Sequence, residues 1–232
     1  MSSRGDLEKA ILDFSRAIEL NPGDVRAYIN RALAYYGQGD FDRAISDFSE
    51  ALKINPRDAY VLNNRGTAYA CKDDFKRAIL DYTEALKLNP EYADAFYNRG
   101  SAYAILGEMD RAISDFSEVL RINPRDAVAF YNRGFAYYHK GDLDQAISDF
   151  NESLKIHPRD IDAYNSRGSA YARKGDFDRA ISDFSEAIKI NPRDADAFYN
   201  RGLVYKEKGD LVKAKADLEK SVELNPGFKR SS

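Results

Sequence analysis

The sequence has little cysteine and little histidine, which limits the kinds of protein it can encode. Its 232 residues include one cysteine, Cys71, and two histidines, His139 and His157. A single cysteine cannot form an internal disulfide, which excludes a disulfide-rich secreted scaffold and a zinc site built from cysteines. Two histidines are too few for a histidine-rich metal site, so we expect no metal and no cofactor.

Long apolar runs and an excess of one charge are also missing. Apolar runs extend over only a few residues, so the sequence predicts no membrane-spanning helix. The first ten residues, MSSRGDLEKA, lack the apolar segment of a signal peptide, and we expect a cytoplasmic protein. The 35 basic and 38 acidic residues alternate along the chain and leave a net charge of −3. This pattern is typical of a solvated, ion-paired surface and unlike that of a nucleic-acid-binding protein.

Proline occurs at only seven positions, and these positions reveal a repeat. A Gly-Asp or Gly-Glu pair recurs with the same spacing and is broken once, by Asp73-Asp74. A fixed period of about 20–50 residues is typical of a solenoid of stacked repeats. The prolines lie 34 residues apart, at Pro22, Pro56, Pro90, Pro124, Pro158, Pro192 and Pro226.

Each unit has the pattern of two amphipathic helices. In the first full unit, residues 25–37 and 41–54 carry apolar or small residues at helical spacing. Asp24 and Asp40 precede these segments and are suited to cap them, because Asp accepts hydrogen bonds from free backbone amides. Gly39 is suited to end the first helix, and Pro56 follows the end of the second.

Glycine recurs in the middle of the first helix of most units. There it costs about 1 kcal/mol relative to alanine. That cost is explained if the second helix passes too close to leave room for a Cβ atom. These glycines are Gly66, Gly100, Gly134, Gly168 and Gly202.

The order of residues in each unit resembles the tetratricopeptide repeat family. An aromatic, a small residue and a Tyr on the first helix are followed by Ala, Phe, Ala and Pro on the second, which is that family's signature. The resemblance covers nearly the whole chain. It implies an all-α, right-handed superhelical α-solenoid of stacked antiparallel helix pairs, whose first helices line a concave groove.

The repeat boundaries follow from this interpretation, in which residues 1–232 form a single array. Lys215 takes the place of an Ile that recurs in the earlier units, so we expect the last repeat to be a polar cap. The array begins with a lone second helix at residues 6–22 and continues with full repeats at 25–58, 59–92, 93–126, 127–160, 161–194 and 195–228.

The groove positions implied by the resemblance are rich in Asn and Tyr. An Asn side chain offers a donor and an acceptor to an extended peptide, and Tyr offers apolar area with a polar tip. The alternative is that such repeats commonly carry Asn and Tyr here without contacting a ligand. The candidate groove residues are Asn64, Tyr97, Asn98, Tyr131, Asn132, Phe135, Tyr138, Tyr199 and Asn200.

Each full repeat also has an Arg on its first helix and an Asp on its second helix. These residues could form a row of anion sites or a ladder of structural ion pairs. Because every Arg has its own Asp, and the Arg fork matches a carboxylate, we favour the structural ladder. In the central repeats the ladder residues are Arg65, Asp81, Arg99, Asp115, Arg133 and Asp149.

The lone helix at the N-terminal end carries a full apolar stripe without a preceding first helix. Burying a large apolar side chain is worth roughly 1.5–3 kcal/mol, so leaving several in water is costly. Two explanations remain open and are compatible: the chain self-associates through this helix, or it is part of a longer parent chain. The candidate self-association residues are Leu7, Ile11 and Ile18.

No motif in the sequence supports catalysis. A Gly-rich phosphate loop and an HExxH pair are both absent. Cys71 and His139 are two repeats apart, whereas a Cys–His nucleophile pair needs hydrogen-bond contact. We therefore expect a non-catalytic scaffold that binds a protein or peptide segment in its groove, with no nucleic-acid or membrane partner. The alternatives are a self-associating assembly module and a regulatory arm of a larger enzyme.

Overall fold

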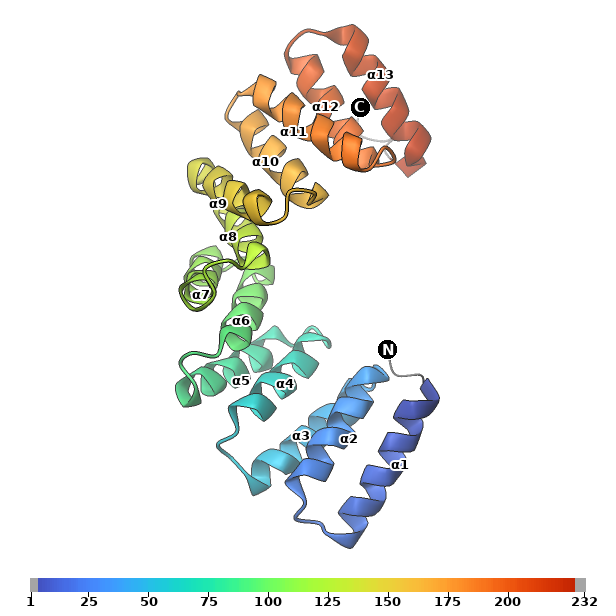
Figure 1. Cartoon of the computed structure of the whole chain (residues 1–232), viewed down its shortest axis with the longest axis vertical. Helices are drawn as coiled ribbons and strands as arrows, with labels where there is room; N and C mark the ends of the chain where they lie inside the picture. Colours follow the sequence, from blue (N-terminus) through green and yellow to red (C-terminus); the bar gives the residue numbers. More distant parts are fainter. Residues whose placement is uncertain (1–3, 228–232) are drawn as a thin grey trace. The chain divides into compact units, whose positions relative to one another are not determined.

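The computed structural model describes residues 4–227, which form thirteen α-helices and no strands (Figure 1). The helices are α1 (Arg4–Leu20), α2 (Val25–Gly37), α3 (Phe41–Ile54), α4 (Ala59–Ala70), α5 (Phe75–Leu88), α6 (Ala93–Ile105), α7 (Met109–Ile122), α8 (Ala127–Lys140), α9 (Leu143–Ile156), α10 (Ile161–Arg173), α11 (Phe177–Ile190), α12 (Ala195–Glu207) and α13 (Leu211–Leu224).

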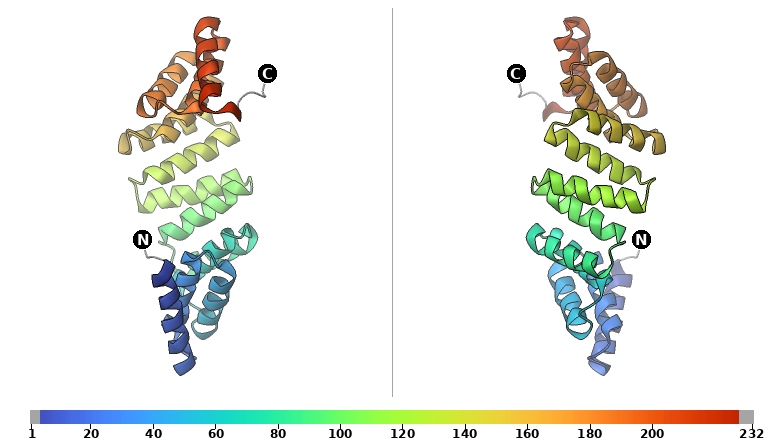
Figure 2. Two further views of the ribbon diagram at one scale, coloured as in Figure 1. Left: turned by 90° about the vertical axis from the view of Figure 1, so that its right-hand side faces the viewer. Right: turned by 90° about the vertical axis from the view of Figure 1, so that its left-hand side faces the viewer.

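The chain divides into two compact units, Met1–Ile122 and Asn123–Ser232. In the first unit, α2 packs on α3, α4 on α5 and α6 on α7, while α1 packs on α2. In the second unit, the pairs are α8 with α9, α10 with α11 and α12 with α13. Within each unit a second helix also packs on the first helix that follows it, so each unit is a stack of helix pairs (Figure 2).

Aspartates cap most of these helices. Asp24 accepts a hydrogen bond from the backbone N–H of Ala27 at 3.1 Å, and Asp40 accepts one from Arg43 at 3.1 Å. Each bond satisfies an amide that has no partner within the helix. The capping expected at Asp24 and Asp40 is therefore confirmed.

The turn between the two helices of a pair requires a left-handed residue. Gly39 has a φ of 79°, and the corresponding glycines of four other pairs also have positive φ. Asp73 stands at this position in the second repeat and adopts a φ of 58°. The turn therefore has the same left-handed conformation where Asp replaces glycine, because Asp adopts positive φ more readily than most residues.

The mid-helix glycines lie where the second helix comes too close for a side chain. A Cβ atom on Gly66 would lie 2.7 Å from Cε1 of Tyr82 and 3.2 Å from the carbonyl oxygen of Ala78. Tyr82 and its counterparts, such as Phe116, are almost fully buried and fill the space between the paired helices. The packing reason expected for these glycines is confirmed.

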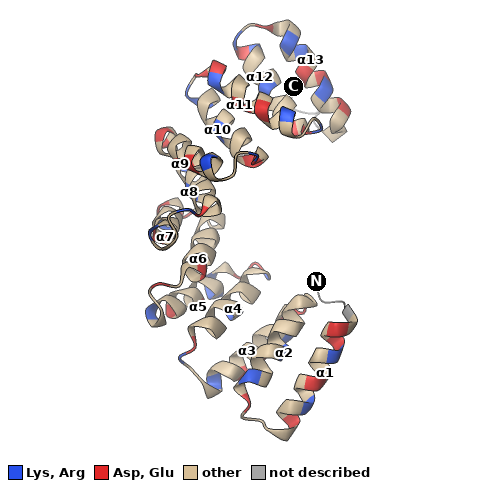
Figure 3. Cartoon of the chain, viewed as in Figure 1, with Lys and Arg blue, Asp and Glu red and all other residues tan. Residues whose placement is uncertain are grey.

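Charged residues of both signs are interspersed along the helices of both units (Figure 3). The C-terminal helix α13 exposes Lys215, which approaches Glu219 at 3.8 Å, and carries the half-buried Lys220, which pairs with Glu223 at 2.9 Å. It also exposes Leu211 and Val212. Along residues 4–227, no helix combines the length and the apolar character needed to cross a bilayer.

Candidate functional site

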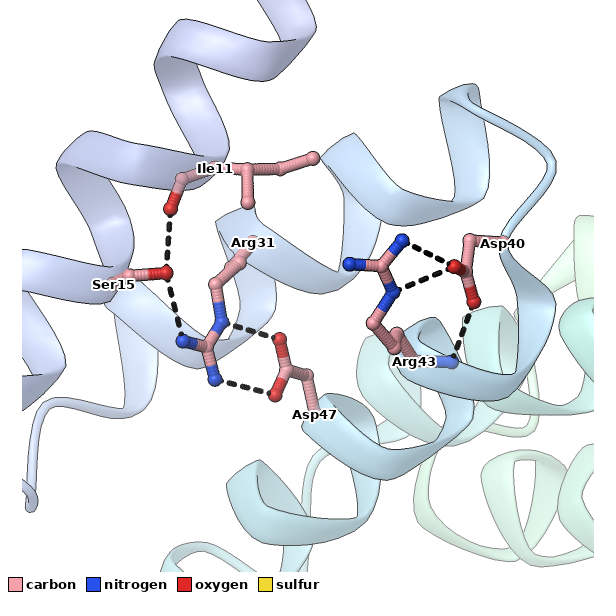
Figure 4. Close-up of polar contacts among 6 residues, drawn as sticks. All are labelled: Ile11, Ser15, Arg31, Asp40, Arg43 and Asp47. Atoms are coloured by element: carbon pink, nitrogen blue, oxygen red, sulfur yellow. Dashed lines mark hydrogen bonds and ion pairs between the residues drawn. The ribbon is translucent and has the colours of Figure 1, made fainter.

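The arginine on α2 joins three helices. Arg31 on α2 binds both carboxylate oxygens of Asp47 on α3, through Nε at 2.7 Å and Nη2 at 2.8 Å (Figure 4). Its Nη1 donates to the hydroxyl of Ser15 on α1 at 3.0 Å, and Ser15 donates in turn to the carbonyl of Ile11 at 2.7 Å. The guanidinium therefore links a first helix to its own second helix and to the preceding one.

The same two-bond arrangement recurs in every full repeat, with Nε and Nη2 of the arginine each on one oxygen of the aspartate. Hydrogen bonding to Asp115 raises the pKa of Arg99, and burial raises the pKa of Asp115 above its usual value despite Arg99. The side chains of Arg99 and Asp115 are both largely removed from solvent. In such surroundings, paired hydrogen bonds between Arg and Asp fix the arrangement of their helices most strongly. The pairs beyond Arg31–Asp47 are Arg65–Asp81, Arg99–Asp115, Arg133–Asp149, Arg167–Asp183 and Arg201–Asp217.

The link to the preceding second helix was not visible in the sequence analysis. Arg65 donates to Ser49 at 3.1 Å, and Arg99 donates to Thr83 at 3.1 Å. In the second unit, Arg167 donates to Asn151 at 2.6 Å. These acceptors lie sixteen residues before each Arg, just as each Asp lies sixteen residues after it. A search for short polar residues at that spacing would have found them.

A cluster of aromatic residues projects from α8 in the second unit. The ring centroids of Tyr131 and Phe135 lie 6.4 Å apart and nearly parallel, and those of Phe135 and His139 lie 4.3 Å apart. Their spacing of four residues puts them on one face of the helix. Phe135 is 39% exposed, and Val128, one turn before Tyr131, is also exposed. This face therefore offers apolar area to a ligand.

Two further residues support the end of this cluster. Tyr138 lies beside His139, with ring centroids 5.5 Å apart at nearly a right angle. Arg173 on α10 lies 5.4 Å from the Tyr138 ring centroid and donates to the Tyr138 carbonyl at 3.0 Å. A cation over an aromatic face is attracted by the ring quadrupole. This contact ties α8 to the neighbouring first helix.

The first helices of the second unit continue this surface. α10 contacts both α8 and α12. The hydroxyls of Tyr131 and Ser166 lie 3.3 Å apart, which joins α8 to α10. On α12, Tyr199 and Asn200 are half-buried, and Leu203 is 38% exposed at the position that corresponds to Phe135. The candidate residues of this unit therefore lie on consecutive, mutually contacting first helices.

Most of the candidate asparagines already make hydrogen bonds within the chain. In the first unit, Nδ2 of Asn98 donates to Oδ1 of Asn63 at 3.1 Å, which joins α6 to α4. Nδ2 of Asn64 donates to the Tyr60 carbonyl at 2.7 Å, and Asn132 makes the same bond to Val128 at 2.8 Å in the second unit. Tyr97 packs against the buried ring of Phe116, with centroids 5.8 Å apart. These contacts hold the candidate side chains in fixed orientations on the surface.

Asn165 on α10 was not among the candidate groove residues, yet it has an unusual polar atom. Its Nδ2 donates to Asp194 at 2.8 Å. Its Oδ1 is buried and has no hydrogen-bond partner among the residues that the structure describes. An acceptor left in this state costs about 1–3 kcal/mol. No sequence signal distinguishes this Asn from Asn63, which occupies the same position in α4 and accepts from Asn98.

The residues predicted for self-association are partly covered within the chain. Leu7 lies against Gly37 of α2, and Ile11 packs against the core around Ala32 and Tyr35. Ile18 is also half-buried. Leu7 and Ile11 contact α2 and keep part of their surface exposed, so their part in self-association stays a prediction.

Cys71 and Tyr36 form a polar contact outside these surfaces. Cys71 is exposed, and its Sγ lies 3.4 Å from the hydroxyl of Tyr36. This hydrogen bond, with burial, raises the pKa of Tyr36 to about 12. Within residues 4–227, no three His, Cys, Asp or Glu side chains come together in a way that could hold a metal ion.

Comparison with family profiles matches tetratricopeptide descriptions along most of the chain. A profile described as a tetratricopeptide repeat matches residues 25–58, 127–160 and 195–228, and a second one matches residues 63–127. A profile described as a TPR repeat matches residues 3–39 and 168–209. A comparison with curated protein sequences finds no match.

Solved structures of tetratricopeptide proteins resemble this chain. MamA is 30% identical with a TM-score of 0.69, over 74% of this chain and 93% of that protein. YrrB, described as a TPR protein with an unusual peptide-binding site, is 27% identical with a TM-score of 0.67, over 77% of this chain and 92% of that protein. The C-terminal part of a TPR repeat-containing protein from Cytophaga hutchinsonii is 22% identical with a TM-score of 0.81, over 97% and 93% of the two chains. This last likeness concerns the fold alone.

Proposed function

The chain belongs to the tetratricopeptide repeat family, and from this premise we propose that it binds a peptide or protein segment along its first helices. The fold is that of a protein-interaction scaffold. We further propose that the main contact surface lies in the second unit, on α8, α10 and α12, and that the chain performs no catalysis.

The observation that carries this proposal is the exposed aromatic face of α8. Tyr131, Phe135 and His139 follow one another at intervals of four residues, and Phe135 remains 39% exposed although it packs on both neighbours. Aromatic residues supply large contact area at a low cost in conformational entropy, so they dominate the energy of many interfaces. Val128 extends the same face toward the start of α8 and Leu203 extends it on α12.

The polar residues beside this face suit an extended ligand. Asn132 and Asn200 occupy the same position on α8 and α12, and Ser166 takes that place on α10. Hydrogen bonds from such side chains can orient a peptide backbone while the aromatic residues bind its apolar side chains. Binding specificity would then come from the residues that differ among the three helices. That a similar protein, YrrB, is described as having a peptide-binding site supports the same function here.

Hydroxyl-radical footprinting tests the proposed location. A peptide is first selected from a displayed random library against the intact chain, and the oxidation of exposed side chains is then compared with and without it. We expect protection of Phe135 and Leu203, and unchanged oxidation of Leu80, which is 68% exposed on the second helix α5. Protection of Leu80 with no change at Phe135 and Leu203 would place binding on another face and overturn the proposal.

A further inference from the structure

The exposed face of the first helices in the second unit begins with an apolar residue on α8 and with acidic residues on α10 and α12. On α8 this residue is Val128, which is 48% exposed and lies one turn before Tyr131 and two turns before Phe135. The equivalent residues, 34 apart, are Asp162 on α10 and Asp196 on α12, and both are exposed. Residues at this spacing share one side of a helix. The two carboxylates therefore lie on the side of α10 and α12 that corresponds to the aromatic face of α8.

Neither carboxylate is neutralised within the chain. Among residues 4–227, no Lys or Arg side chain pairs with Asp162 or Asp196. Arg173 lies eleven residues after Asp162 on α10, about 16 Å away along the helix axis, and contacts Tyr138 instead. The start of this face is therefore negatively charged.

The loop arginines before α10 and α12 lie toward another part of the repeat. Arg159 and Arg193 occupy the position of Glu91, which binds Arg121 on the second helix α7 at 2.9 Å. That loop position is therefore beside the second helices, whereas the two carboxylates belong to the first helices.

The carboxylates of α10 lie close to the aromatic residues of α8. The hydroxyl of Tyr131 is 3.3 Å from that of Ser166 on α10. Burial raises the pKa of Tyr131, and the negative charges of Asp162 and Asp160 raise it further. Charges act in this way at short range, because the Coulomb energy falls with separation. A ligand that covers the neighbouring ring of Phe135 therefore comes within reach of these carboxylates.

Hydrogen-bond acceptors are also in excess between α10 and α12. Nδ2 of Asn165 donates to Asp194, while its buried Oδ1 has no partner among the residues that the structure describes. On α4, the equivalent Asn63 accepts a hydrogen bond from Asn98 of the next first helix. Asn200 takes the place of Asn98 on α12, and no such bond joins it to Asn165 in the described part of the chain. The group that suits this region is a positively charged donor.

We propose that the segment bound by α8, α10 and α12 carries an arginine or lysine next to apolar residues. The basic side chain donates to Asp162 and Asp196, and the apolar residues cover Phe135 and Leu203. Arginine and lysine offer donors only, so they complement a site made of acceptors, and the same carboxylates repel an acidic segment. This inference rests on the proposed function, because it names the chemistry of the segment that binds there.

Peptides selected from a displayed random library on the intact chain are the probes, and we expect each to contain a basic residue beside apolar ones. The double variant Asp162→Asn with Asp196→Asn should bind a labelled peptide about tenfold or more weakly, as measured by anisotropy at about 0.15 M salt. The capping residues Asp160 and Asp194 are unchanged, so the helices should still form.

A matched control removes the same amount of charge from the second helices of this unit. Glu152→Gln with Glu186→Gln alters α9 and α11 and should change the dissociation constant by less than about twofold, because salt screens distant charges. A charge reversal gives a test that a folding defect cannot imitate. A peptide whose basic residue is replaced by Glu should bind the Asp162→Lys, Asp196→Lys chain better than the unaltered chain.

The variant Phe135→Ser separates a failure of this inference from a failure of the proposed function. Peptides that lose affinity for Phe135→Ser but bind the Asp162→Asn, Asp196→Asn chain as tightly as the unaltered chain would overturn the inference alone. Selected peptides without a basic residue would overturn it too. Peptides whose binding is unaffected by all of these substitutions would overturn both proposals.

Discussion

Arg99 and Asp115 form two parallel hydrogen bonds, each of 2.8 Å, between α6 and α7. Nη1 of the same guanidinium donates to Thr83 on α5, so one side chain holds three helices in register. Asp115 is buried, and this burial raises its pKa. Such a pair costs desolvation energy to form, and its main effect is to specify how the helices meet.

Removing one partner of this pair should therefore be far more damaging than replacing both. Asp115→Ala leaves the buried Arg99 without a counter-charge, and we expect a loss of about 3–5 kcal/mol in the free energy of unfolding. The double variant Arg99→Met with Asp115→Leu should recover most of that loss. Urea denaturation followed by circular dichroism measures both. A double variant as unstable as Asp115→Ala would contradict this account of the ladder.

Substitutions at two of the left-handed turn residues should change the stability of the chain in opposite directions. Asp73 has a φ of 58° at the position where Gly175 has a φ of 80°. Asp73→Gly should stabilise the chain by up to about 1 kcal/mol, because glycine adopts this region without steric cost. Gly175→Ala should destabilise it by about 1–2 kcal/mol. Thermal melts of the two variants check the pair, and a shift in the same direction for both would be inconsistent with the turn geometry.

A charge introduced at Ile11 should loosen the docking of α1 on α2 more than a charge introduced at Leu12. Ile11→Glu places a carboxylate against the core around Ala32, so it should loosen the docking of α1 on α2. Leu12→Glu changes a side chain that is 70% exposed and should have little effect. Limited proteolysis within residues 5–24 is the readout. Equal resistance of the two variants would show that Ile11 does not anchor α1.

Acid should weaken the chain through capping aspartates such as Asp176. The hydrogen bond from the Arg179 side chain lowers the pKa of Asp176 below 3.8. The unfolded chain then takes up this proton first as the pH falls. The stabilisation by ionised Asp176 is complete above the unfolded pKa and is lost as the pH falls through the folded pKa.

Asp176→Asn provides the matched test, because Asn can still cap the helix but does not titrate. Between about pH 6 and about pH 3, the unaltered chain should lose more stability than the variant. Urea midpoints measured at the two pH values give the difference. If both proteins lost the same amount, the lowered pKa of Asp176 would have no part in acid unfolding.

Much of the architecture could be predicted from residues that fix the backbone locally. Proline and the Gly-Asp turns mark the ends of helices, and these constraints operate within a few residues of sequence. The mid-helix glycines also predicted that the two helices of a repeat approach each other closely. Gly66 and Tyr82 confirm this, because a Cβ atom on Gly66 would overlap the Tyr82 ring. Asp73 is the informative exception, since the sequence shows a broken pattern and the backbone keeps the same turn.

Other features depend on contacts that sequence spacing does not separate. Ile11 and Phe14 belong to one apolar stripe of α1, and both are half-buried. The equivalent Ile45 is also half-buried, whereas the equivalent Phe48 is fully buried, and the apolar pattern alone does not predict this difference. The unpaired Oδ1 of Asn165 could not be predicted either, because Asn63 occupies the same position and finds a partner in Asn98.

The most direct test of the central claim is the affinity of a selected peptide for two matched single variants. Phe135→Ser introduces the residue that α10 carries at the same position, Ser169, so the fold should accept it. Leu80→Ser introduces the residue found at the equivalent position of α3, Ser46, and removes an exposed apolar side chain from a second helix. If the aromatic face of α8 binds the ligand, Phe135→Ser should weaken binding by about tenfold or more, while Leu80→Ser leaves it unchanged. Unchanged affinity in Phe135→Ser, with a loss in Leu80→Ser, would contradict the assignment of the binding surface to the first helices.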